Sequence, residues 1–466
     1  MNKLVKSIRE AIKLANLSDG MTVSFHHHLR NGDYVLNMVL DEISALGIKN
    51  LTINASSLFD IHKPIIKHIE NKTVTKIATD YVSANLGKIF SEGIMENPIE
   101  FRTHGGRPAD IESGKTPIDV AFIAAPTADN MGNCTGKIGK SACGSLGYAF
   151  ADAMHAKKVV VITDNLVEYP LNDCSIPEKY IDYVAVVDAI GNPAGIVSGT
   201  TKITRDPIGL IMASQAAKII EASGLLKDGF SFQTGAGGAS LAVSKFLKSI
   251  MLEKQIVGSF GLGGITSYLV DMLKCGCFKE LLDVQCFDLG AVESICQNPN
   301  HKEISAIQYA SPNNPNAAVN NLDVVILGAT EIDTDFNVNV HTDSNGYLMG
   351  GSGGHSDTAA GSKLSMIIAP MFRARLPIIT DHVNCISTPG KDIDVLVTQG
   401  GIAVNPKNYE LRQKLIDAKL PVMDINDLKK KVENITGVPQ KLPKGDKQIA
   451  TIIGRNGDIL DNIYNV

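Results

Sequence analysis

The sequence contains no tryptophan, and aromatic residues make up only 5% of its 466 residues. It also lacks any unbroken run of 18 apolar residues, so no segment is predicted to cross a membrane. The charges nearly balance, with 44 Lys and Arg against 49 Asp and Glu, and no block of five like charges occurs. This balance argues against a nucleic-acid partner. The first residues carry cations but no apolar core segment, so a signal peptide is not expected.

Cysteine is sparse as well. Only Cys275 and Cys277 lie close together among the eight cysteines, and their spacing is not that of a zinc site. A chain of this length can bury enough apolar surface to fold without disulfide bonds. We therefore expect a reduced, cytoplasmic protein with no metal ion. Two domains are expected, because 466 residues exceed one ordinary core.

Glycine, in contrast, is abundant, with 42 residues, and the chain contains an internal repeat. Four segments of the first half resemble four segments of the second half in the same order, at a separation of roughly 200 residues. The pairs are 19–20 with 228–229, 118–133 with 322–339, 159–166 with 377–383, and 181–188 with 393–401. Four collinear matches favour duplication over coincidence.

The repeated segments are short apolar runs that end in Gly, Asp, Asn or Pro, and helical patterns lie between them, for example over 4–17, 147–156 and 409–419. The runs do not alternate with polar residues, so both faces of the sheet should be buried. This predicts an α/β fold of two tandem, duplicated, open parallel-sheet domains. We place them at residues 1–204 and 205–466, because Asp206 and Pro207 suit a helix start. A terminal hairpin turning at Asn456-Gly457 is assigned to the second domain.

The clearest candidate site is the glycine-rich segment 350–357, which precedes a helical pattern. Successive backbone N–H groups at a helix start can hold a phosphate or a carbonyl oxygen that becomes negative. A flexible loop or tight turn is the alternative. Two further glycine clusters, 234–238 and 260–267, follow expected strands and have the same two interpretations. Thr266 or Ser267 would cap a helix if neither takes part in chemistry.

Polar residues follow other expected strands. His26 and His28 should share one face of a strand and His27 the other. A metal site would need a third ligand that no nearby motif supplies, so an anion-facing strand end is expected. Arg107, in the segment HGGR, can form a forked contact with a carboxylate, or lie exposed in a loop. The alternating carboxylates 331, 333 and 335 are expected to be a solvated strand edge, with a metal site or a nucleophile as alternatives.

Ten sequence blocks extend the pattern over nearly the whole chain. They are SFHH (24–27), HGGR (104–107), CGSLGYA (143–149), TGAGGASLAV (234–243), LGGIT (262–266), LLDVQCFD (281–288), NPNHKEISAIQYA (298–310), EIDTDFNVNV (331–340), SGGHSDTA (352–359) and GIAVNP (401–406). Together they resemble the family of citrate lyase α subunits, which is related to the family I coenzyme A transferases.

The resemblance implies domains of the coenzyme A transferase type and a reaction in which citrate replaces acetate on an acyl-carrier thioester. It implies two partner subunits. One is the γ subunit, an acyl carrier whose prosthetic group derives from dephospho-coenzyme A, and the other is the β subunit, which cleaves the citryl thioester. Coenzyme A thioesters are expected to substitute for the carrier. The chain itself is expected to bind no cofactor covalently and to self-associate.

Three groups of site residues follow from the loops and the resemblance. Those expected to act in catalysis are Gly263, Gly264, Ser267, Gly353 and Gly354. Those expected to bind citrate are His26, His27, His104, Gly105, Gly106, Arg107, Thr266, Ser352 and His355. Those expected to bind the thioester or the carrier are Gly235, Gly237, Gly238, Gln308 and Gly351.

The sequence departs from the family I pattern at one position. Those enzymes use a glutamate in a segment like G-x-H-[ST]-E, four residues before an aspartate, whereas this chain has Ser267 before Asp271. We therefore expect citrate to attack the acetyl thioester directly and form a mixed anhydride, because a carboxylate is already ionised at neutral pH. Two alternatives remain open. One is a transferase that acts on another carboxylic acid through a glutamyl intermediate, and the other is a catalytically silent scaffold subunit.

Overall fold

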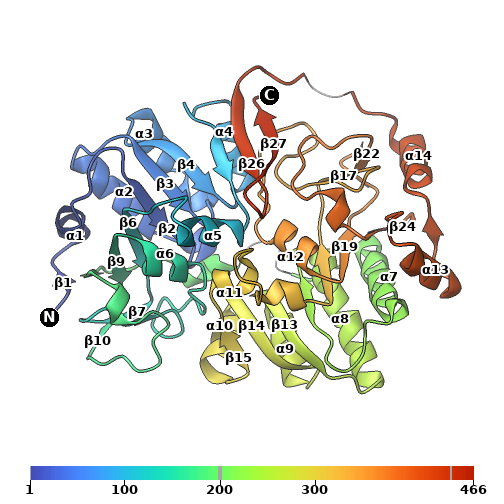
Figure 1. The fold of residues 1–466 in the computed structure, drawn as a ribbon, viewed down its shortest axis with the longest axis horizontal. Coiled ribbons are helices and arrows are strands. Elements are labelled where there is room, and N and C mark those ends of the chain that lie inside the picture. Colours follow the sequence, from blue (N-terminus) through green and yellow to red (C-terminus); the bar gives the residue numbers. More distant parts are fainter. Residues whose placement is uncertain (1, 198–201, 441–442) are drawn as a thin grey trace.

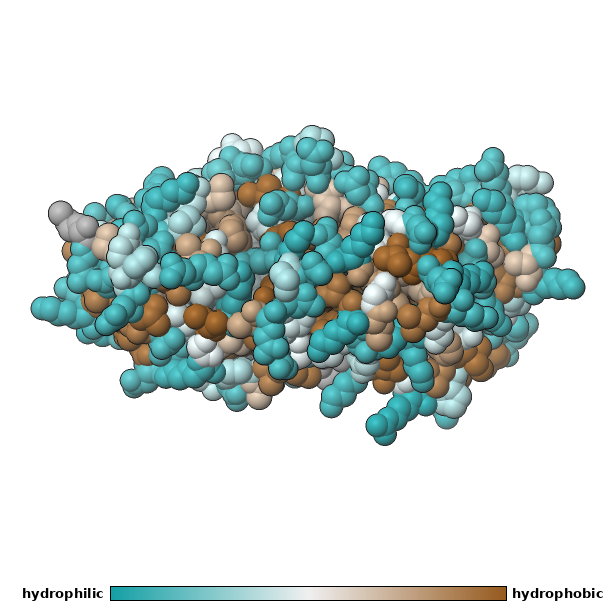
Figure 2. All heavy atoms as spheres, turned by 90° about the horizontal axis from the view of Figure 1, so that it is seen from below, coloured by the Kyte–Doolittle hydropathy of each residue, from teal (hydrophilic) through white to brown (hydrophobic). Residues whose placement is uncertain are grey.

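The computed structural model describes residues 2–197, 202–440 and 443–466. Two α/β domains lie side by side, the first blue to green and the second from green through orange to red (Figure 1). Among the described residues, no helix is long and apolar enough to cross a bilayer. The face seen from below carries mostly hydrophilic side chains with separate hydrophobic patches (Figure 2).

The first sheet has ten strands among the described residues, and its central members are buried, non-alternating runs such as VAFIA and VVVIT. Its order is β1 (Leu4–Val5), β11 (Tyr183–Val186), β9 (Lys158–Thr163), β6 (Val120–Ala124), β2 (Thr22–Phe25), β3 (Leu51–Ala55), β4 (Val74–Thr79), β5 (Ile99–Phe101), β26 (Gln448–Ile453) and β27 (Ile459–Tyr464). The helices are α1 (Ile8–Leu14), α2 (Val35–Ala45), α3 (Ile65–Glu70), α4 (Ala84–Ser91), α5 (Gly106–Glu112) and α6 (Ala149–His155).

The second sheet has nine strands among the described residues. Its order is β15 (His301–Glu303), β14 (Phe278–Cys286), β13 (Gly258–Ile265), β12 (Phe232–Thr234), β16 (Val324–Leu327), β19 (Leu364–Ile368), β23 (Val395–Thr398), β24 (Gly401–Val404) and β25 (Val422–Met423). The helices are α7 (Pro207–Ser223), α8 (Gly238–Glu253), α9 (Ser267–Lys274), α10 (Leu289–Gln297), α11 (Ala306–Ala310), α12 (His355–Gly361), α13 (Tyr409–Asp417) and α14 (Ile425–Thr436).

The two sheets share one topology. Within the described ranges, seven parallel strands of the first sheet, from β11 to β5, correspond in order to β23, β19, β16, β12, β13, β14 and β15 of the second. A small sheet accompanies each: β10 (Leu166–Val167), β7 (Thr127–Asp129) and β8 (Cys134–Thr135), and β22 (Ile379–Thr380), β17 (Glu331–Asp333) and β18 (Val338–Asn339). The structure thus supports the predicted duplication.

One repeated loop shows the duplication at the level of side chains. Asp129 accepts hydrogen bonds from the backbone of Met131 and Asn133, and Asp333 accepts them from Asp335 and Asn337. These are loops tied by their own aspartate. Glu331 and Asp333 are both buried, and only Asp335 is exposed. The expected solvated strand edge is therefore wrong for the first two residues, and Asp333 has a structural role.

Several local expectations are confirmed and several need correction. Helix α7 begins with Pro207, and the side chain of Asp206 caps it. The helix expected over 4–17 is shorter, because residues 4–5 pair with β11 as an edge strand. The match of 159–166 with 377–383 is wrong in register. Residues 159–163 lie in β9, whose counterpart in the second sheet is β19, whereas residues 379–380 lie in the small sheet at the place of β10.

The terminal hairpin forms as expected but belongs to the other sheet. Strand β26 runs parallel to β5, with Ala450 opposite Ile99, and β27 pairs antiparallel to β26. The hairpin covers an edge of the first sheet that would otherwise expose unpaired backbone groups. The chain therefore crosses from the second domain back to the first (Figure 1), which amends the division at residue 204 for these strands.

Candidate functional site

The polar residues that follow the strands of the first domain meet the glycine-rich loop of the second. The loop joins β4 and β5 through backbone contacts: His104 N–H donates to Gly353 O at 2.8 Å, and Gly353 N–H donates to Asp80 O at 3.2 Å. Thr103 and Gly353 form a parallel bridge. This is the position where open parallel sheets place their ligands, beyond the carboxyl ends of the strands.

His104 is held by a buried carboxylate at this junction. Its Nδ1 lies 2.9 Å from Oδ2 of Asp80, whose side chain is fully buried. Burial raises the pKa of Asp80, and the contact with His104 opposes this effect. The carboxylate accepts the proton on Nδ1, so Nε2 is left to interact with a ligand. That atom lies beside Gly353, where an added Cβ would be 3.2 Å away.

His27, His104 and Tyr148 form one cluster of rings at this junction. The ring of His27 packs on Tyr148 at 4.8 Å and lies 6.2 Å from the ring of His104, which also contacts Tyr148, at 4.5 Å. Ser56 Oγ lies 2.6 Å from Nδ1 of His27, and burial lowers the pKa of this imidazole well below its ordinary value. A neutral His27 that accepts the serine proton at Nδ1 keeps Nε2–H as a donor.

Gly354 brings the loop against Tyr309. An added Cβ on Gly354 would lie 2.4 Å from the tyrosine hydroxyl, so only glycine permits this approach. Gln233 Nε2 donates to the same hydroxyl at 2.8 Å, and burial raises the pKa of Tyr309, which keeps the phenol protonated. Within the described residues, no acceptor contacts the N–H of Gly354. A phenol O–H and a backbone N–H therefore remain as donors at this point.

The rest of the loop is anchored within the protein. Ser352 Oγ pairs with Ser356 Oγ at 2.9 Å, and Gly351 lies against the backbone of Asp80. His355 contacts Thr388 Oγ1 through Nδ1 and Gly328 O through Nε2, and its burial lowers its pKa to about 4. Both ring nitrogens of His355 and the hydroxyl of Ser352 thus already have partners within the protein. Neither side chain is therefore assigned a contact with citrate.

The segment 104–107 connects the domains through its backbone. Gly105 N–H donates to Asp357 Oδ2 at 2.9 Å, and Gly106 N–H donates to Thr103 Oγ1 at 2.8 Å. An added Cβ on Gly105 would lie 2.1 Å from Ala310 O, so this glycine permits close packing against α11. These N–H groups are occupied, which leaves the imidazole of His104 as the part that can reach a ligand.

Arg107 does not face the cluster. Its guanidinium is buried, pairs bidentately with Asp152 at 2.7 and 2.9 Å, and donates through Nε to Asn54 Oδ1 at 2.7 Å. The carboxylate on which its fork closes is thus one of the protein's own. His26 is also directed elsewhere: its ring lies 5.8 Å from that of His28, and burial lowers its pKa to about 4.

The segment 260–267 ends strand β13 and starts α9. Gly263 has φ +106° and lies against Gln233, and an added Cβ on Gly264 would be 2.2 Å from the ring of Phe287. Ser267 is exposed, and its Oγ donates to Asp288 Oδ1 at 2.7 Å. Thr266 is the N-cap residue, and its hydroxyl is buried without a partner in the described part of the chain.

The segment 234–238 lies at the start of α8. Gly237 is the N-cap residue and makes no side-chain cap, while Gly235 N–H donates to Ile326 O at 2.8 Å. The 16-residue helix that follows gives this partly exposed loop a positive dipole end. Gln308 is elsewhere, exposed on α11, where its side chain completes a capping box with Ser305.

Sequence reasoning missed several residues of the cluster: Asp80, Tyr148, Tyr309, Gln233 and Arg30. Asp80 directly follows strand β4, so the rule that ligands gather at carboxyl ends would have found it. The two tyrosines and Gln233 do not lie in a sequence motif or at a spacing that would have indicated a role in a site. Arg30 is buried between Phe59 and Phe287, with its guanidinium carbon 5.6 and 4.3 Å from the ring centroids.

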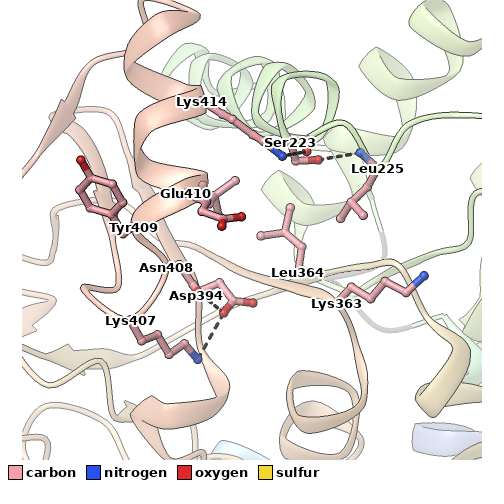
Figure 3. Close-up of a pocket in the computed structure, with 11 residues that line it drawn as sticks. Ser223, Leu225, Lys363, Leu364, Asp394, Lys407, Asn408, Tyr409, Glu410 and Lys414 are labelled. Atoms are coloured by element: carbon pink, nitrogen blue, oxygen red, sulfur yellow. Dashed lines mark hydrogen bonds and ion pairs between the residues drawn. The ribbon is translucent and has the colours of Figure 1, made fainter.

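A separate pocket of about 390 Å³ lies at the opposite edge of the second sheet (Figure 3). It includes Lys363 and Leu364 at the start of β19, Asp394 before β23, and α13. Its cations are already paired, Lys407 with Asp394 and Lys414 with Ser223 O. Lys363 pairs with Asp323, so each lysine that lines the pocket already has a partner among the described residues. The pocket is also remote from the carboxyl ends of the strands.

Another buried group could be mistaken for a metal site. Asp283, Cys286 and His301 place one potential ligand atom each within 4.8 Å of one another. Asp283 Oδ2 already accepts from His301 Nε2 and from Cys286 Sγ, both at 3.0 Å. An added Cβ on Gly144 would be only 2.2 Å from Cys286 Sγ, so the first domain packs tightly on this sulfur. Hydrogen bonds and packing account for the group.

Comparisons with known proteins agree over the full length. A family model for the α subunit of citrate lyase matches residues 1–466. The chain is 48% identical over 464 residues to the citrate lyase alpha chain of Klebsiella pneumoniae, covering 100% of this chain and 91% of that one. It is 47% identical over 464 residues to the citrate lyase alpha chain of Haemophilus influenzae, covering 100% and 93%.

Solved structures show the same fold. A structure from Streptococcus mutans, assigned to the α subunit of citrate lyase and solved in complex with citrate, is similar with a TM-score of 0.98 and 48% identity, covering 100% of this chain and 92% of that one. A malonate decarboxylase α subunit from Acinetobacter baumannii has a TM-score of 0.70 at 16% identity, covering 93% and 89%. A 4-hydroxybutyrate coenzyme A transferase from Porphyromonas gingivalis has a TM-score of 0.60 at 18% identity, covering 93% and 97%. These confirm the predicted fold class.

Proposed function

The chain belongs to the family of citrate lyase α subunits, and we propose that it exchanges the acetyl group of an acyl-carrier thioester for citrate, releasing acetate. The observation that carries this proposal is the pair of hydrogen-bond donors at Gly354 and Tyr309, next to His104, which Asp80 orients. Such donors suit a reaction that develops negative charge on a carbonyl oxygen.

The proposed first step is attack by a citrate carboxylate on the acetyl thioester. A carboxylate oxygen bonds to the acetyl carbon, the carbon–sulfur bond breaks, and the carrier leaves as a thiolate. The product is a mixed anhydride of citrate and acetate. The thiolate then attacks the citryl carbonyl and the anhydride bond breaks, which gives the citryl thioester and acetate. Both nucleophiles are anions, so no general base is needed.

The protein's task is then to position the reactants and stabilise two successive oxyanions. We assign this role to the N–H of Gly354 and the hydroxyl of Tyr309, which lie against each other at the domain junction. Nε2 of His104, whose Nδ1–H is held by Asp80, acts beside them as an acceptor that positions the reactants. His27 contributes Nε2–H from the neighbouring ring. Asp80 acts as a positioning residue, because its fully buried carboxylate orients His104.

The absence of a carboxylate nucleophile at Ser267 supports direct attack. The serine hydroxyl donates to Asp288, which also caps α10 by accepting from Ala291 N–H. In the described part of the chain, the two acidic residues nearest the loop, Asp80 and Asp357, are both engaged in hydrogen bonds.

The carrier end of the thioester is proposed to lie along the second domain. The start of α8 at Gly237 and Gly238 suits a phosphate of the dephospho-coenzyme A-derived group, since helix N-termini attract anions. We propose the γ acyl-carrier subunit as the physiological partner there and the β subunit as the consumer of the citryl thioester. Coenzyme A thioesters would replace the carrier in vitro. Self-association and a cytoplasmic location remain part of the proposal.

The direct test is to incubate the pure chain with acetyl-coenzyme A and citrate and to look for citryl-coenzyme A and acetate by mass spectrometry. We expect both products in equal amounts. Citrate binding without any citryl thioester would favour a silent scaffold subunit. Trapping of a labelled glutamate by hydroxylamine or borohydride would favour an ordinary family I transferase.

A further inference from the structure

Arg30 is a buried arginine that no carboxylate of the described residues contacts. Its exposed fraction is 8%, and its one hydrogen bond in the described part of the chain runs from Nη1 to Ile196 O at a long 3.4 Å. The other two buried arginines differ, because Arg102 pairs with Asp110 and Arg107 pairs with Asp152. A buried charge is ordinarily compensated, so the guanidinium of Arg30 is available to an incoming anion.

Aromatic rings from both domains hold this guanidinium in place. Its central carbon lies 4.3 Å from the ring centroid of Phe287 in the second domain and 5.6 Å from that of Phe59 in the first. Phe287 is itself seated against Gly264, where no Cβ would fit. Stacking uses the flat faces of a guanidinium and leaves its N–H donors, which lie in the plane.

Arg30 also belongs to the cluster that contains His27. Phe59 contacts both residues, with its ring 5.8 Å from the ring of His27. The Arg30 backbone donates to His27 O at 3.0 Å and has φ +55°, a left-handed conformation that is uncommon for arginine. Backbone strain of this kind is retained where the surrounding structure fixes a side chain for a purpose.

The charge of Arg30 persists at neutral pH. Burial lowers its pKa to about 10, while Tyr81 and Tyr148 oppose that effect. Citrate carries three carboxylates, of which one reacts, so two anionic groups need partners elsewhere. The forked donors of a guanidinium match one carboxylate.

We infer that Arg30 binds a citrate carboxylate that does not react, and thereby selects a polycarboxylate for the transfer. This inference rests on the proposed exchange reaction. It assigns to Arg30 the contact that the sequence had suggested for Arg107.

The test compares Arg30→Gln with the wild type in the full chain, using acetyl-coenzyme A and citrate. We expect the KM for citrate to rise about 10- to 100-fold, the range of a charge-assisted hydrogen bond. The KM for acetyl-coenzyme A should stay within about twofold. Arg30→Lys keeps the charge but loses the forked pair of donors, so its KM for citrate should lie between those of the wild type and Arg30→Gln. Arg9→Gln removes an exposed arginine outside the cluster and should leave both constants unchanged.

An unchanged citrate KM in Arg30→Gln would overturn the inference. An equal rise of both constants together with a lowered melting temperature would assign Arg30 to domain packing and also overturn it. If Arg30→Gln does not fold, Arg30→Lys decides in the same way. A wild type that forms no citryl thioester refutes the exchange reaction instead, and calorimetric binding of citrate to the wild type and to Arg30→Lys still tests the contact.

Discussion

His104 and Gly353 meet across the two domains. Nε2 of His104 lies 3.2 Å from where a Cβ on Gly353 would be, and the glycine has φ +50°. The backbones of the two residues are joined by a 2.8 Å hydrogen bond from His104 N–H to Gly353 O. The imidazole of His104 is therefore positioned at a contact between the domains, and the proposed site includes residues of both.

Gly353→Ala should disrupt this contact. The new methyl group displaces the imidazole, and the left-handed backbone adds about 1–2 kcal/mol of strain. Because a shift of the loop also moves the neighbouring N–H of Gly354, we expect the rate of exchange to fall on the order of a hundredfold, as for loss of one oxyanion donor. The matched control is Gly276→Ala, which has φ +76° but no atom within 4 Å of the added Cβ. It should lose stability by a similar amount and keep its activity. Near-normal turnover of Gly353→Ala would remove the loop from the site.

Asp80→Asn should lower the rate without weakening citrate binding much. The amide no longer enforces a proton on Nδ1 of His104, so the imidazole can present the wrong tautomer at Nε2. We expect kcat to fall about 10- to 100-fold, which is the range typical for removal of the hydrogen-bond partner that orients a functional histidine. His104→Gln should fall at least as far. An Asp80→Asn enzyme with full kcat would show that the pair is not used.

Arg107→Gln should act on stability. Removing one partner of a buried ion pair leaves the carboxylate of Asp152 uncompensated, which costs about 3–5 kcal/mol. Denaturant unfolding of Arg107→Gln, Asp152→Asn and the double variant measures this. The double variant should be more stable than the sum of the single losses predicts. If folded Arg107→Gln showed only a raised citrate KM, with unchanged unfolding, Arg107 would be a substrate ligand after all.

Ser267→Ala separates the covalent from the direct route. The hydroxyl donates to Asp288 on the surface, so its loss should cost about 0.5–2 kcal/mol of stability and little activity. A serine nucleophile would make the loss many orders of magnitude. Single-turnover assays with labelled acetyl-coenzyme A decide the question. Label that remains on the wild-type polypeptide and vanishes in Ser267→Ala would contradict direct attack.

Stability should fall as the pH is lowered from about 6.5 to about 4. Burial lowers the pKa of both His26 and His355 to about 4, whereas the unfolded chain protonates them near 6.5. In this window the unfolded state binds more protons, so unfolding is favoured as the pH falls. Each of the two histidines should lower the free energy of unfolding by about 2 kcal/mol between pH 7 and pH 5. Denaturant midpoints at the two pH values measure this loss of stability. His355→Gln should lose less stability between pH 7 and pH 5 than the wild type.

The sequence predicted the two parallel sheets because their strands are continuous apolar runs, and it located the glycine loop because glycines before a helix are a local signal. It could not show that β26 completes the first sheet, since pairing with β5 is a contact between distant segments. Nor could it show the partners of Arg107 and Arg30. Both arginines follow strands in similar settings, and only the fold reveals that Asp152 meets one of them and no described carboxylate meets the other.

The central claim is that a citrate carboxylate attacks the acetyl thioester directly. A single turnover of acetyl-coenzyme A with citrate labelled by ¹⁸O in its carboxylates tests this most directly, with the label followed by mass spectrometry in acetate and in the protein. Direct attack leaves a citrate oxygen on the acetyl group, so the account predicts one ¹⁸O atom in the acetate and none in the polypeptide. Unlabelled acetate together with ¹⁸O in an enzyme carboxylate would contradict it.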